Sequence, residues 1–82
     1  MATIDVLASK LAEDTMKAMA ETGNDRLFME VGEVLAAASQ SLEEAYLMEV
    51  RVRFAERAAR NFLIRRLHEE RAKAKAATNP DD

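Results

Sequence analysis

The feature that most constrains this chain is the segment 42–77, which contains neither glycine nor proline. Glycine and proline are the residues that most strongly disfavour a helix interior, and the next breaker is the pair Asn79-Pro80. A continuous helix over 42–77 would be about 54 Å long at 1.5 Å per residue. Any fold must therefore accommodate one helix that is longer than the remaining residues can cover.

Two shorter amphipathic helices are predicted before it, over about 4–22 and 25–38. Apolar residues recur at helical spacing on one side of the first, at Ile4, Leu7, Ala8, Leu11, Ala18 and Met19. The second has the same pattern at Leu27, Phe28, Val31, Val34, Leu35 and Ala38. Gly23 suits a left-handed residue after a helix, and Asn24 or Asp25 suits a helix N-cap. The two segments should form an antiparallel helical hairpin.

The break before the long helix is predicted at Ser39-Gln40-Ser41. Ser41 and Glu44 fit the S-x-x-E capping box, in which each side chain accepts a backbone N–H of the other residue. A helix running straight through is the alternative, because these three polar residues do not force a stop. Gly32 in mid-helix suggests that another backbone packs close to it. We expect one helical domain over 1–77 and a disordered tail over 78–82.

Composition supports an all-α fold class, because alanine, leucine, glutamate, arginine and methionine dominate and β-branched and aromatic residues are few. Cysteine is absent, so disulfides and thiolate metal sites are excluded. The first residues lack the pattern of a secretory signal, and the longest apolar run, 34–38, is far shorter than the roughly 18 residues of a membrane span. We expect a cytoplasmic protein.

The long helix carries more apolar surface than a hairpin can cover. The second helix spans roughly 21 Å, so residues up to about Ala59 can pack within their own subunit, whereas 60–77 need a partner. A homo-oligomer is the simplest partner, since most soluble oligomers are symmetric, and a second protein is the other. The predicted oligomer interface consists of Phe54, Phe62, Leu63 and Leu67. Alternatively, the helix bends or frays early and folds these residues onto the hairpin.

Charge is unevenly distributed along the chain. Residues 1–50 hold three basic and ten acidic side chains, whereas residues 51–82 hold nine basic and five acidic ones. The candidate nucleic-acid contacts on the basic helix are Arg57, Arg60, Arg65, Arg66, Arg71, Lys73 and Lys75. The alternative is that arginines form i, i+4 pairs such as Glu56–Arg60 and that Arg51 and Arg53 meet the acidic second helix of the same or a neighbouring subunit.

No pattern points to catalysis, a metal or another cofactor. His68 is the only histidine, and the residue three before it is Arg65, so the Glu-x-x-His pattern of di-iron bundles fails. No phosphate-binding glycine loop or nucleophile–base arrangement is present. Basic residues flank bulky apolar residues in the segment 61–67, as they do in helices that lie on a membrane surface. The same residues suit a contact between two helices equally well. We therefore expect no enzyme activity and no membrane partner.

The predicted shape is a short helical hairpin followed by one long helix. In shape alone it resembles the ring-forming core of viral small terminase subunits, and also small helical regulators or adaptors that dimerise through a long helix. The leading hypothesis is a non-enzymatic oligomerisation or adaptor module that mediates protein–protein assembly. The alternative is an oligomeric nucleic-acid-binding component, of a DNA-packaging or regulatory complex, that uses the basic helix.

Overall fold

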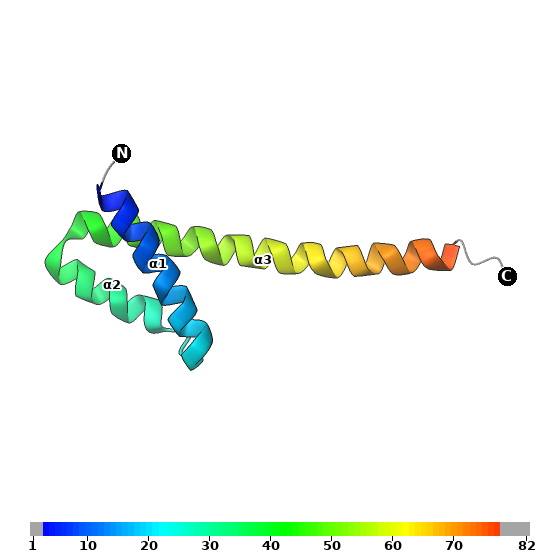
Figure 1. Cartoon of the computed structure of the whole chain (residues 1–82), viewed down its shortest axis with the longest axis horizontal. Helices are drawn as coiled ribbons and strands as arrows, with labels where there is room; N and C mark the ends of the chain where they lie inside the picture. Colours follow the sequence, from blue (N-terminus) through cyan, green and yellow to red (C-terminus); the bar gives the residue numbers. More distant parts are fainter. Residues whose placement is uncertain (1–2, 78–82) are drawn as a thin grey trace.

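Three helices and no strand make up the part of the chain that the computed structural model describes, residues 3–77. They are α1 (Thr3–Thr22), α2 (Leu27–Ala38) and α3 (Gln40–Ala77). In Figure 1, α1 and α2 pack at one end of α3, and the rest of α3 extends away from them alone. The radius of gyration is 19.3 Å, against about 12 Å for a compact domain of this length. The predicted tail, 78–82, lies outside the described residues.

Local signals set the turn between α1 and α2. Gly23 has φ = +76°, and its N–H donates to the carbonyl of Met19 at 2.9 Å, so it ends α1 as predicted. The Asn24 side chain accepts the N–H of Arg26 at 3.1 Å. It thereby orders the turn that precedes α2, which begins two residues later than expected, at Leu27.

The break between α2 and α3 is a single residue, Ser39, in extended conformation. Its N–H donates to the carbonyl of Leu35 at 2.7 Å, and its hydroxyl accepts the N–H of Leu42 at 3.2 Å. Ser39 therefore ends one helix and caps the next. The predicted break is correct, but the predicted cap is wrong, because Ser41 already lies inside α3.

The core lies where all three helices meet. Its fully buried side chains are Ala8 and Ala12 of α1 and Tyr46 and Val50 of α3. The Tyr46 hydroxyl donates to the carbonyl of Phe28 in α2 at 3.0 Å, so one side chain links α3 to α2 while it packs in the same cluster as α1. Sequence reasoning missed Tyr46, although it lies four residues from both Leu42 and Val50 on one face of the helix.

The predicted apolar faces of α1 and α2 are only partly buried. In α1 the buried residues are Ala8, Ala12, Thr15 and Met16. Ile4 and Leu7 remain exposed, because α1 meets the core through small residues that allow a closer helix approach than leucine would. In α2, Val34 is 70% exposed, so its predicted place in the core is also wrong.

We predict that Gly32→Ala stabilises the protein. An added Cβ would lie 3.6 Å from the Leu47 side chain, which is an ordinary contact. The atoms nearest to this added Cβ belong to the side chains of Leu47 and Tyr46. The sequence-based expectation that another backbone packs against Gly32 is therefore wrong. Alanine should raise the free energy of unfolding by up to about 1 kcal/mol through helix propensity. Urea unfolding measures this free energy. The matched control is Gly23→Ala, which should destabilise the protein because Gly23 has a positive φ. Destabilisation by both substitutions would contradict this packing.

We predict that the protein loses stability as the pH rises above about 10. Burial raises the pKa of the Tyr46 phenol, and the hydrogen bond with Thr15 lowers it by a smaller amount. The unfolded chain therefore loses this proton at a lower pH than the folded protein does, which favours unfolding. Urea unfolding at neutral and alkaline pH measures the effect. Tyr46→Phe should show a smaller alkaline loss, and an equal loss in both proteins would exclude Tyr46 as its cause.

Candidate interaction surface

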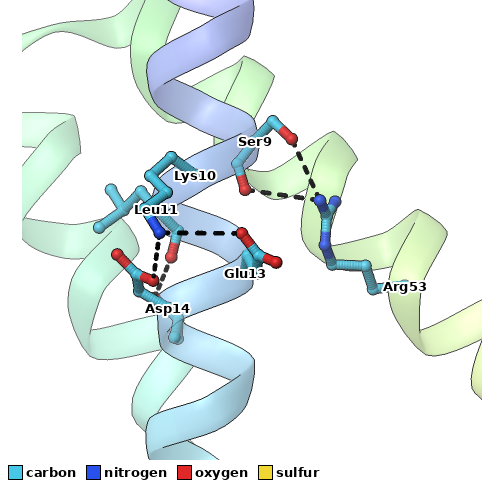
Figure 2. Close-up of polar contacts among 7 residues, drawn as sticks. Ser9, Lys10, Leu11, Glu13, Asp14 and Arg53 are labelled. Carbon is cyan, nitrogen blue, oxygen red and sulfur yellow. Dashed lines mark hydrogen bonds and ion pairs between the residues drawn. The ribbon is translucent and has the colours of Figure 1, made fainter.

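Two contacts hold α3 at the point where it leaves the other helices. Arg53 donates to the carboxylate of Glu49 in its own helix at 2.6 Å. Figure 2 shows that it also donates to the hydroxyl and carbonyl oxygens of Ser9 in α1, at 3.1 and 3.4 Å. The Phe54 ring packs edge-to-face on Phe28, with centroids 5.1 Å apart. Arg53 thus contacts α1, whereas the sequence interpretation placed it against the acidic α2. Phe54, predicted for the oligomer interface, packs within its own chain.

Within the described residues, no residue of α3 after Phe54 packs against the hydrophobic core. Of residues 55–77, hereafter the rod, all are exposed except the half-buried Arg66. The intramolecular core therefore ends five residues before Ala59, the predicted limit, because α1 crosses α3 instead of running beside it (Figure 1). Residues 3–54 are called the head below. The early bend or fraying considered as an alternative does not occur, since α3 is helical to Ala77.

Large apolar side chains are exposed along the rod. The exposed fractions are 55% for Phe62, 60% for Leu63, 48% for Ile64 and 42% for Leu67. Three of them are the remaining predicted interface residues, and the structure brings these onto one continuous segment of helix. The Arg65 guanidinium lies over the Phe62 ring, 5.6 Å from its centroid, and covers part of it.

The exposed apolar residues of α3 continue from the rod into the head along one side. At 100° per residue they lie within an arc of about 100°, and we call them the apolar stripe: Met48, Val52, Ala55, Ala59, Phe62 and Leu63. Met48 and Val52 are 57% and 56% exposed although they belong to the head. The side of α3 that carries the stripe is therefore open along both parts of the molecule.

A shallow groove borders the stripe on the α1 side. Its lining includes the apolar side chains of Met16 and Val52. The charged side chains in the lining are Glu13 and Lys17 of α1 and Glu49, Arg53, Glu56, Arg57 and Arg60 of α3. A smaller hollow continues along α3 to Leu63. The groove is open and lined by side chains of both signs, which suits contact with another helix better than capture of a small ligand.

The basic side chains of the rod do not form one face. Arg60 donates to Glu56 at 2.7 Å, as the i, i+4 interpretation predicted. Arg66 forms ion pairs with both Glu69 and Glu70, and the Lys73 ammonium nitrogen lies 3.7 Å from a carboxylate oxygen of Glu70. At 100° per residue, four of the seven predicted contacts lie within an arc of about 60° and the other three point elsewhere. The four are Arg57, Arg60, Arg71 and Lys75, and the three are Arg65, Arg66 and Lys73. The structure therefore brings four of the seven onto one side of the rod and does not bring the other three there.

Two further findings concern the other classes of site. Among residues 3–77, no three side chains of histidine, aspartate or glutamate come together as a metal site would require, and His68 is exposed on the rod. No helix within the described residues is long and apolar enough to cross a membrane.

Comparison with known proteins adds no relative. No family model, curated protein or solved structure matches the chain.

We predict weak retention of mixed duplex DNA in filter binding at moderate salt, because carboxylates already pair with Arg60, Arg66 and Lys73 and the basic side chains do not all share one side of the rod. The matched variant is Glu69→Gln with Glu70→Gln, which releases Arg66 and Lys73 from their ion pairs. Retention should then rise, and it should fall steeply with added salt. Tight, steeply salt-dependent retention by the unaltered protein would contradict the prediction.

Proposed function

We propose that this protein is a non-enzymatic assembly module that joins subunits through the rod and the apolar stripe. The observation that carries the proposal is that α3 continues for 23 residues past Phe54, the last residue packed on the hydrophobic core, while bearing Phe62, Leu63, Ile64 and Leu67. A helix with no neighbour usually has a polar surface. These four side chains are instead about half exposed.

The energetic reason is the cost of leaving these side chains in water. Full burial of a leucine, isoleucine or phenylalanine contributes about 1.5–3 kcal/mol. Covering the exposed halves of four such residues contributes roughly 3–6 kcal/mol in total, comparable with the stability of a small domain. Assembly also supports the helix itself, because an isolated helix of this length is only marginally stable in water.

A nucleic-acid role has less support. The rod holds seven basic and three acidic residues, which favours an anionic partner in general. The ion pairs of Arg60 and Arg66 leave fewer cations for a continuous phosphate backbone, which favours an acidic protein surface as the partner.

We predict that Phe62→Gln with Leu63→Gln converts the protein into a monomer of 9.2 kDa. Glutamine keeps the helix propensity but removes the apolar contact, so helicity of the head should persist. Light scattering at micromolar concentration measures the mass, and circular dichroism measures helicity.

The matched control is Val34→Gln, which removes an equally exposed apolar residue from α2 and should leave the assembled mass unchanged. The proposal fails if the unaltered protein is a stable folded monomer at micromolar concentration.

A further inference from the structure

The apolar stripe has a nearly symmetric order along α3. A two-fold axis placed between Ala55 and Glu56 would bring Met48 of one copy opposite Leu63 of the other, and Val52 opposite Ala59. A second copy turned by a two-fold axis at that point would place medium-sized side chains opposite each other at the ends of the seam and the small Ala55 near its centre. Four of the six stripe residues thus lie opposite stripe residues, while Phe62 falls opposite Glu49 and Ala55 opposite Glu56. The stripe is therefore largely self-complementary, as an isologous interface requires.

Pairing the same stripe in parallel meets an electrostatic obstacle. The spacing of the stripe continues through Arg66 and Lys73, which occupy the same side of the helix as Val52 and Ala59. In a parallel pair each of these side chains would face its own copy in the seam. Like charges at that distance are unfavourable, whereas in the antiparallel pair Arg66 lies opposite Ala45 and close to Glu44.

The charges of the two parts of the molecule favour the same arrangement. The head holds five basic and ten acidic side chains, a net charge of −5, and the rod holds seven and three, a net charge of +4. Antiparallel docking places each basic rod along the acidic head of the other copy. Parallel docking brings head to head and rod to rod, which adds repulsion at both ends.

We propose that the occupant of the stripe is a second copy of this chain, docked antiparallel about a two-fold axis near Ala55. The inference rests on the proposed function and specifies its partner and geometry. Residues 40–71 of α3 then overlap along about 48 Å. A contact strip about 10 Å wide covers about 500 Å² per copy, near the lower size of a specific interface. The expected dimer therefore forms at micromolar rather than nanomolar concentration.

Spin-label distances distinguish the two orientations. The chain contains no cysteine, so Ala72→Cys or Ala58→Cys introduces one label site per copy, in each case on exposed positions away from the stripe. In the antiparallel dimer the two positions 72 lie about 50 Å apart along the seam, and the two positions 58 lie within about 20 Å. In a parallel dimer both pairs lie within about 20 Å.

Pulsed electron paramagnetic resonance measures these distances on the full chain, with the mass of each labelled sample checked by light scattering. A dimer mass, a long distance at 72 and a short one at 58 are the expected result. A dimer with short distances at both positions overturns the antiparallel inference and leaves the proposed function intact. A mass of three or more copies also overturns it, whereas a monomer mass overturns both proposals.

Discussion

The structure depends on how closely α1 approaches α3 around Tyr46. Ala8 and Ala12 have no side chain beyond Cβ, so α1 can lie near α3 and enclose Tyr46 and Val50 completely. The Tyr46 hydroxyl then needs a partner, since a buried hydroxyl without one is costly, and the Phe28 carbonyl of α2 provides it. One aromatic side chain thus positions all three helices, and the core ends within two turns of it.

The rod is a consequence of that small core. Because α1 crosses α3, Phe54 is the last residue of α3 that packs against the hydrophobic core. The rod stays helical through its composition, since alanine, arginine, leucine and glutamate are strong helix formers and i, i+4 pairs such as Glu56–Arg60 add a few tenths of a kcal/mol each. Helix propensity and these ion pairs maintain the helix, but they leave its apolar side chains exposed to solvent.

Charge and apolar pattern act together in the proposed assembly. The stripe supplies surface that favours burial, and the opposite charges of head and rod favour one orientation of a second copy. Charge–charge contacts at an interface contribute more to orientation and association rate than to affinity. The mixed charge of the groove lining fits such a role, because neither sign alone dominates there.

The sequence by itself determined the three helices, the turn at Gly23, the break near Ser39 and the excess of apolar surface on α3, because these follow from local propensity and from length. It could not determine which face of each helix is buried. Ile4, Leu7 and Val34 match the helical period as well as Ala8 or Leu35 do, and only the crossing of α1 over α3 decides which are covered. That crossing also decided that Phe54 is internal, whereas Phe62 and Leu63 lie on an open stripe, because helix contacts depend on the relative positions of elements distant in sequence.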